Sequence, residues 1–224
     1  YAMLAVIFVL VFSTIFGANP YRSFWSNYER MEGLVGHLHL FAYFLLLVGV
    51  LRTDTDWRRM FYALSGAGAL AAFYGYLQAT GVVMISQQSG PRVDGTFGNA
   101  SYMAVFALFS VFIAAYLFFK SEKQWQKILF ASLFLLEIPV IFLTATRGTI
   151  LGLLGGLLLG ALLFAVSGGG RRIRMAALGT IGGLVVFAGI FWLSRETTFV
   201  QENYVLSRFR QLSFSERTVE SRFT

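Results

Sequence analysis

Arginine side chains stand in the polar links between long apolar stretches, where their charge could hold an anion. The clearest case is Arg147, in the tight turn Leu143-Thr-Ala-Thr-Arg-Gly148. Thr144 or Thr146 is predicted to cap the helix that follows this turn. Arg147 would then lie at the positive end of that helix, where a lone cation is unfavourable and a bound anion is stabilised by both groups. An arginine that only extends to the membrane interface is the alternative interpretation.

A second arginine, Arg92, stands before a glycine-rich link in the segment 90–102. Gly95, Gly98 and Asn99 favour turns that expose backbone N–H groups, and such turns can hold anions. A glycine-rich turn is more often a simple connection, so this pattern by itself is a weak indication of a binding site.

The link 19–32 combines aromatic rings with arginine and glutamate side chains. Trp25, Tyr28 and Arg30 could form a rim that faces a glycan or a lipid headgroup, together with Asn99 of the later link. An aromatic belt at the headgroup level, with solvated charges, is the alternative.

Glu137 is an ionisable residue inside an apolar stretch, two positions before Pro139. A charge at that depth costs at least about 2.5 kcal/mol, so a functional role is the default hypothesis for this residue. The alternative is a protonated carboxyl bonded to a carbonyl that Pro139 leaves free. The two histidines, His37 and His39, cannot share a helix face and are interpreted as interfacial polar groups. With no cysteine present, neither a metal site nor a disulfide is predicted.

The elements that must position these residues are long and apolar. Hydrophobic residues make up 57% of the 224 residues and charged residues 13%, against about 25% in an average soluble domain. A membrane-spanning helix needs roughly 20 mostly apolar residues, and about seven stretches qualify. The chain is therefore predicted to be an all-α, polytopic transmembrane bundle, and the stretches are 2–16, 34–51, 60–84, 102–119, 128–144, 149–166 and 175–193.

Basic residues predict the orientation of these stretches. One alternate set of three links holds nine of the 18 lysines and arginines, including all three lysines, whereas the other set holds four. The richer set is predicted to be cytoplasmic, which places Arg92, Arg147 and the C-terminal tail outside. Residues 1–194 form one predicted membrane domain, and residues 195–224 are the start of an outer loop of a longer chain. In a soluble protein the net charge of +7 would raise nucleic-acid binding, but here it indicates topology, and no nucleic-acid partner is expected.

Glycines recur every four residues in the stretch 149–166 and just before it, at Gly148, Gly152, Gly156 and Gly160. Small residues at this spacing let two helices approach closely. The pattern therefore predicts a helix-packing seam.

Three segments together resemble the O-antigen ligase and polymerase superfamily of membrane glycosyltransferases. Gly95-Thr-Phe-Gly-Asn-Ala-Ser-Tyr-Met-Ala104 is similar to the family's Gly-Thr-Phe-Gly-Asn-Pro-Asn run, from which it departs at Ala100 and Ser101. Thr144-Ala-Thr-Arg-Gly-Thr-Ile-Leu-Gly152 resembles the family's Ser-Arg-Gly segment. The tail 215–224 resembles a Ser-rich stretch that ends in an arginine. The resemblance covers the chain from about residue 34 onward.

The resemblance implies a GT-C-like fold in the plasma (inner) membrane and transfer of a glycan from a polyprenyl-pyrophosphate donor to a lipid or glycan acceptor. It implies no metal and no cofactor. Arg147 matches the first of two arginines that bind the donor pyrophosphate, and Arg222 matches the second, with Arg217 as the competitor. The family's acceptor-activating His has no counterpart after His39, so it is expected beyond residue 224.

A membrane transporter or flippase is the alternative function. Transporters often carry ionisable residues or broken helices near the bilayer midplane, commonly in paired repeats. Only Glu137 fits that description, and no internal repeat is evident. Polar residues are concentrated instead in the links predicted to lie outside, which favours an enzyme acting at the membrane surface.

Overall fold

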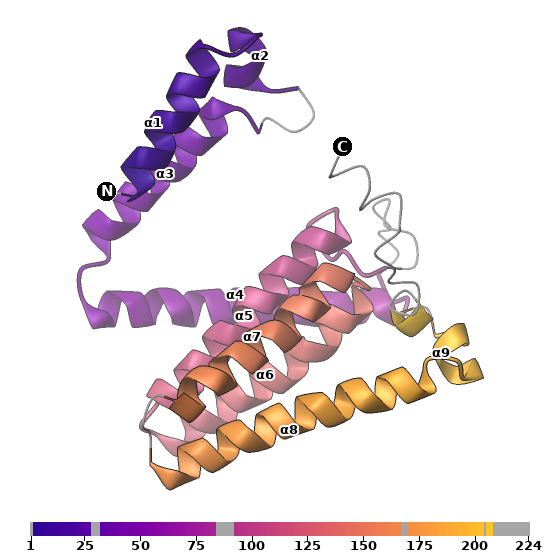
Figure 1. Cartoon of the computed structure of the whole chain (residues 1–224). Helices are drawn as coiled ribbons and strands as arrows, with labels where there is room; N and C mark the ends of the chain where they lie inside the picture. Colours follow the sequence, from indigo (N-terminus) through magenta and orange to yellow (C-terminus); the bar gives the residue numbers. More distant parts are fainter. Residues whose placement is uncertain (1, 28–31, 84–91, 167–169, 204, 208–224) are drawn as a thin grey trace. The chain divides into compact units, whose positions relative to one another are not determined.

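The computed structural model describes residues 2–27, 32–83, 92–166, 170–203 and 205–207, and helices are its only regular elements (Figure 1). The predicted all-α class is confirmed for this part of the chain. The helices are α1 (Ala2–Ile15), α2 (Pro20–Trp25), α3 (Leu34–Val50), α4 (Asp54–Ala79), α5 (Ala100–Lys120), α6 (Gln124–Leu143), α7 (Arg147–Val166), α8 (Arg171–Ser194) and α9 (Thr198–Glu202).

Five described helices are long and apolar enough to cross a membrane: α4, α5, α6, α7 and the Ile173–Ser194 part of α8. Helices α1 and α3 are apolar but have only 14 and 17 residues. All seven predicted stretches are helical, although their limits differ. For example, α4 begins at Asp54 rather than at residue 60, because Asp54 and Asp56 in its first turn complement the positive end of the helix dipole.

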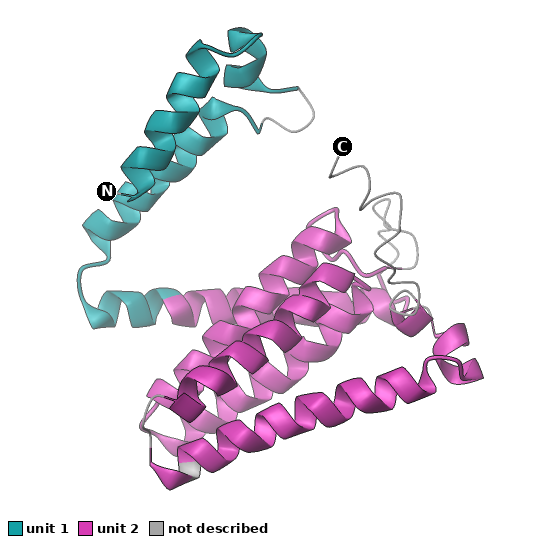
Figure 2. Ribbon diagram, viewed as in Figure 1, with its two compact units in different colours: residues 1–60 teal, residues 61–224 magenta. Residues whose placement is uncertain are grey.

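The chain divides into two compact units, residues 1–60 and 61–224 (Figure 2). In the first unit, α1 and α2 pack against α3. The Asn19 side chain caps α2 by accepting a hydrogen bond from the Arg22 N–H at 3.1 Å. A Cβ added at Gly33 would stand 2.3 Å from the Phe24 carbonyl oxygen. Glycine at this position therefore lets the end of α2 lie against the start of α3.

In the second unit, α5 and α6 pack along each other, α7 packs against both, and α8 runs along α7 (Figure 1). Side chains from α5, α6 and α7 form the apolar core of this bundle. The buried members of this core are Ala107, Val111, Ile141, Ile150 and Leu153. The tail returns to the bundle after α8, because Val205 packs against the same core.

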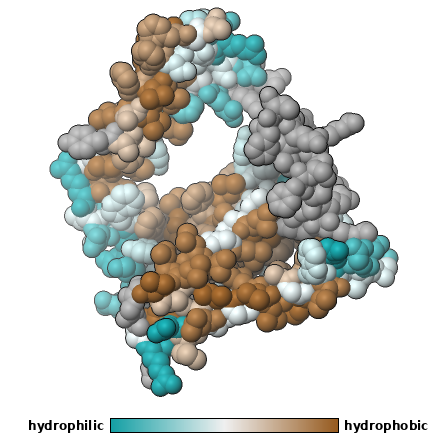
Figure 3. All heavy atoms as spheres, viewed as in Figure 1, coloured by the Kyte–Doolittle hydropathy of each residue, from teal (hydrophilic) through white to brown (hydrophobic). Residues whose placement is uncertain are grey.

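Large apolar side chains cover the outside of the second unit. Phe164 of α7 and Ile190 of α8 are 52% and 61% exposed. Figure 3 shows apolar residues along the visible flanks of this unit and hydrophilic residues at its margins. Apolar surface of this extent is unfavourable in water and matches lipid tails. The second unit therefore has the surface of a multi-pass membrane bundle.

Helix α4 buries a face made of small residues: Ser65, Gly68, Ala72 and Gly75. A Cβ at Gly75 would stand 2.7 Å from the Met103 Cε of α5. The Tyr76 hydroxyl donates a 2.6 Å hydrogen bond to the Leu136 carbonyl of α6. Small side chains thus let α4 lie directly against α5 and α6.

The predicted glycine seam of α7 is formed at two of its four positions. A Cβ at Gly156 would lie 2.5 Å from the Phe112 Cζ of α5, and one at Gly152 would lie 3.3 Å from the Leu108 Cδ2. At Gly148 and Gly160 an added Cβ would meet nothing within 4 Å. The close contact between α7 and α5 is therefore made by Gly152 and Gly156.

This difference predicts the outcome of paired substitutions. Gly156→Leu should lower the free energy of unfolding in detergent micelles by about 1–3 kcal/mol, because the new side chain overpacks the α5 interface. Gly160→Leu, one turn away on the same helix, should leave it nearly unchanged. Equal melting temperatures for the two variants, measured by the soluble fraction after heating, would contradict the packing.

Candidate functional site

The turn between α6 and α7 is held by its own hydroxyl and backbone groups. Thr144 is fully buried, and its hydroxyl donates to the Ile141 carbonyl at 2.7 Å. Ala145 adopts a left-handed conformation with φ of 48°. The Thr146 carbonyl then accepts the N–H groups of Thr149 and Ile150, both at 3.2 Å. The chain therefore reverses within three residues and starts α7 at Arg147.

Arg92 fastens the α4–α5 link to this turn. Its Nε donates to the Thr144 carbonyl and its Nη2 donates to the Thr146 hydroxyl, both at 2.8 Å. The neighbouring Val93 N–H donates to the Leu143 carbonyl at 3.2 Å. Arg92 and Arg147, which are far apart in the sequence, therefore flank the same residue, Thr146.

The sequence-based cap of α7 needs one correction. Of the two threonines that the sequence left open as caps, Thr146 occupies the position before the helix. Among the described contacts, however, its hydroxyl accepts from Arg92 and lies 3.5 Å from the Ala100 carbonyl rather than capping an N–H of α7. The contact with Ala100 brings the start of α5 to the same place. We call this end of the second unit, where α5 and α7 begin and Arg92 and Arg147 lie, the arginine end.

The glycine-rich link adopts the predicted turns. Gly95 and Gly98 have positive φ angles of 56° and 69°. The Asn99 side chain caps α5 by accepting the Ser101 N–H at 2.8 Å. The expectation that this link exposes its N–H groups to an anion is wrong at Gly95, since its N–H donates to the Gln78 side chain at 2.8 Å.

Gln78, near the end of α4, binds this link at three points. Its Oε1 accepts the N–H groups of Asp94 and Gly95, at 3.2 and 2.8 Å, and its Nε2 donates to the Asp94 Oδ1 at 2.7 Å. Asp94 is fully buried, and within the described part of the chain its Oδ2 has no hydrogen-bond partner. Sequence reasoning missed both residues. The sequence offered one signal for this contact: Gln78 is a polar residue near the end of an apolar stretch, and Asp94 is a polar residue directly before Gly95.

The buried carboxyl of Glu137 lies within the second unit and not at the arginine end. It is fully buried in α6, and its Oε1 accepts a 2.9 Å hydrogen bond from the Ser110 hydroxyl of α5. The described bond is therefore to a serine rather than to a carbonyl freed by Pro139. Ser110 was not singled out from the sequence, because one serine in an apolar helix is common.

The predicted rim is described in part, with Trp25 in the first unit and Asn99 in the second. Trp25 ends α2, is 47% exposed, and packs edge-to-face on Phe24 at a centroid distance of 4.9 Å. Tyr28 and Arg30 lie outside the described residues, as do Arg217 and Arg222 of the tail. The grouping of these residues with Arg147 thus stays a prediction.

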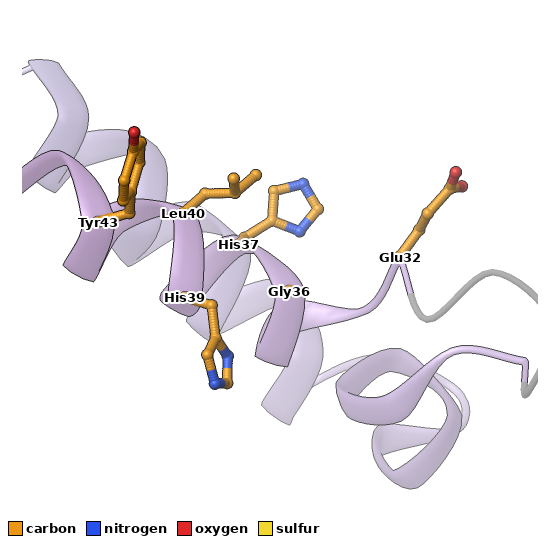
Figure 4. A pocket seen from close by; sticks show the side chains of 6 residues that line it. All are labelled: Glu32, Gly36, His37, His39, Leu40 and Tyr43. Atoms are coloured by element: carbon orange, nitrogen blue, oxygen red, sulfur yellow. The ribbon is translucent and has the colours of Figure 1, made fainter. Parts of the chain in front are cut away.

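A shallow hollow of about 690 Å³ lies on the first unit beside α3. Figure 4 shows His37 and His39 projecting from different sides of α3, as their spacing predicts. Their Nδ1 atoms lie 3.0 and 2.7 Å from the carbonyl oxygens of Gly33 and Val35. The described residues contain no cluster of three or more His, Asp or Glu side chains that could hold a metal ion.

Chemically, the arginine end is suited to an anionic group. The Arg92 guanidinium bonds to Thr146 directly before α7, Arg147 is the first residue of that helix, and the helix dipole gives this end partial positive charge. A guanidinium presents paired N–H donors that match phosphate oxygens.

The chain matches no protein-family model, and neither the curated proteins nor the solved structures include a match.

Proposed function

We propose that this chain is the donor-binding membrane part of a glycosyltransferase of the O-antigen ligase and polymerase type. It would transfer a glycan from a polyprenyl-pyrophosphate donor to a lipid or glycan acceptor. One observation supports the proposal most strongly. Two segments that carry the resemblance, 95–104 and 144–152, meet at the arginine end, where the Thr146 hydroxyl lies 3.5 Å from the Ala100 carbonyl. Arg92, just before the first segment, bonds to Thr144 and Thr146 of the second.

In the proposed reaction the acceptor hydroxyl attacks the anomeric carbon of the donor sugar. A new glycosidic bond forms, the bond from that carbon to the phosphate oxygen breaks, and the lipid pyrophosphate leaves with the bonding electrons. Arg92 and Arg147 would stabilise the charge that develops on the leaving pyrophosphate. The acceptor proton would pass to a general base, the role that the family gives to a histidine. Arg222, or Arg217 in its place, would supply the second arginine of the family pattern.

The proposal also includes the number of membrane spans and their orientation. Helices α1 and α3 would add two spans to the five, giving about seven in a GT-C-like arrangement. The arginine end and the tail would face outside the plasma membrane. Membrane lipids would contact the apolar flanks, and the exposed Trp25 would lie at the headgroup level.

The proposal predicts a selective loss of activity in the full-length protein. Arg147→Ala should reduce glycan transfer at least about a hundredfold, because a group stabilising the developing charge is removed. Arg147→Lys should restore only part of the activity, since an ammonium lacks the paired donors of the guanidinium. The measurement is transfer of a labelled glycan from its polyprenyl pyrophosphate in proteoliposomes.

The matched control for this test is Arg171→Ala, at the start of α8, where Arg171 is exposed. This variant should insert into the membrane and transfer glycan at the wild-type rate. Normal transfer by Arg147→Ala, with equal amounts of inserted protein, would overturn the proposed pyrophosphate site.

The buried Glu137 favours a second candidate, a transporter or flippase, because ionisable groups inside spanning helices often belong to transport pathways. Proteoliposomes distinguish the two functions. Movement of a fluorescent polyprenyl-pyrophosphate lipid across the bilayer without glycan transfer would support the second candidate and contradict the first.

A further inference from the structure

Glu137 forms the centre of a polar cluster that joins three helices. Its side chain has no exposed surface, and those of Ser65 on α4 and Ser110 on α5 are 1% and 2% exposed. The Ser110 hydroxyl donates to the Glu137 Oε1 at 2.9 Å. The other carboxyl oxygen, Oε2, and the Ser65 hydroxyl have no hydrogen-bond partner among the described residues. The cluster thus contains two buried oxygen atoms whose hydrogen-bonding capacity is unused.

Helix α4 closes this cluster at Gly68. A Cβ added at Gly68 would overlap the Ser110 hydroxyl oxygen and stand 2.6 Å from the Glu137 Oε1. Ser65 precedes Gly68 by three residues, so both lie on the same buried face of α4. The unpartnered hydroxyl of Ser65 and the carboxyl of Glu137 therefore belong to one helix interface.

No opposite charge among the described residues compensates a carboxylate at this position. The buried faces of α4, α5 and α7 carry only uncharged side chains. The titratable group of α4 described at this interface is Tyr76, whose hydroxyl donates to the Leu136 carbonyl at 2.6 Å. Arg147 on α7 belongs to the arginine end. An ionised carboxyl without a cationic partner is strongly disfavoured in such surroundings.

We propose that Glu137 is a proton-binding site that fastens α4 to α5 and α6. In the neutral carboxyl, Oε1 accepts from Ser110 while Oε2 carries the proton. Donation from the Oε2–H to the Ser65 hydroxyl, which lies on the same buried face of α4 as Gly68, would satisfy both unused oxygens. The neutral carboxyl thereby links three helices through two hydrogen bonds, one accepted from Ser110 and one donated to Ser65.

A proton fits this site better than a metal cation does. On the α4 side, even a Cβ at Gly68 would stand 2.6 Å from the Glu137 Oε1, so the backbone of α4 lies close to that oxygen. The cluster offers two carboxyl oxygens and two hydroxyls, and hard cations such as Mg²⁺ and Ca²⁺ take about six or more oxygen ligands. The inference is independent of the proposed glycan transfer, because it concerns different residues.

Infrared spectroscopy of the whole chain in lipid bilayers tests the proposal directly. At neutral pH we expect a C=O stretching band of a protonated carboxyl that is absent from Glu137→Gln. Glu122→Gln, which removes an exposed carboxyl in the α5–α6 link, should leave the band in place. Absence of the band in the wild-type protein would show an ionised carboxyl and overturn the proposal.

Serine variants test the proposed hydrogen bond to α4. Ser65→Ala should shift the protonated-carboxyl band to higher frequency, because the Oε2–H loses its acceptor. Ser132→Ala, on the same helix as Glu137 and outside the described buried face of α6, should not shift it. An unshifted band in Ser65→Ala would contradict the link to α4.

Melting measurements give a second readout. Glu137→Gln keeps the shape and neutrality of the protonated side chain, so it should insert and melt within a few degrees of the wild type. The wild-type melting temperature should fall as the pH becomes alkaline, and that of Glu137→Gln should fall much less. Failure of Glu137→Gln to fold, or a rise in wild-type stability on adding sodium in place of choline, would overturn the proposal.

Discussion

Gly68→Val is expected to separate α4 from the bundle and to lower the free energy of unfolding by about 3 kcal/mol or more. The added Cβ would overlap the Ser110 hydroxyl and stand 2.6 Å from the Glu137 Oε1. Both atoms belong to fully packed residues, so relief requires either loss of their hydrogen bond or movement of α4. Stability is measured by reversible denaturation in mixed micelles.

The matched control is Gly66→Val on the same helix. An added Cβ at Gly66 would meet nothing within 4 Å, so this change alters helix propensity alone. Equal stability of the Gly66→Val and Gly68→Val variants would mean that α4 does not lie against α5 and α6 as described.

Gln78→Leu is the second substitution with a large expected effect. Leucine removes all three hydrogen bonds that hold Asp94 and Gly95. The Asp94 Oδ1 then loses its described donor, and Oδ2 has none among the described residues. A buried carboxyl and two buried N–H groups that lose their described partners should cost roughly 3–5 kcal/mol. The link 92–99 would loosen, and Arg92 would lose its fixed position beside Thr146.

The Gln78 prediction has a readout besides stability. Cysteine crosslinking between the positions of Val93 and Leu143, whose backbones are joined by a 3.2 Å hydrogen bond, should form readily in the wild-type background and weakly with Gln78→Leu. Gln124→Leu, at an exposed position at the start of α6, is the control. Unchanged crosslinking with Gln78→Leu would contradict the role of Gln78 in holding the link.

The helices were predictable from the sequence because long apolar runs impose them. The first and last residues of the helices were less predictable, since a helix can begin among charged residues, as α4 does at Asp54. Trp25 was predicted within a link, whereas the structure places it at the end of the short helix α2 that Asn19 caps. Such short helices depend on one capping side chain and leave little trace in hydropathy.

The candidate site was predictable in its residue types but not in its pairing. Arg92 and Arg147 were identified separately, as charges beside turns. Their meeting at Thr146 depends on a long-range hydrogen bond, and no periodicity in the sequence encodes that contact. The bonds of Gln78 to Asp94 and of Ser110 to Glu137 are likewise long-range, which is why their partners were missed.

The order of Ser65, Ser110 and Glu137 along the chain has a consequence for biogenesis. Ribosomes deliver spanning helices to the membrane from the N-terminus onward. Both serines therefore precede the carboxyl, and α4 and α5 are synthesised before α6 reaches the bilayer. A lone helix that carries a glutamate inserts at a cost, which earlier helices reduce by offering hydroxyl partners. Insertion of α6 should therefore be more efficient when α4 and α5 precede it than when it is expressed alone.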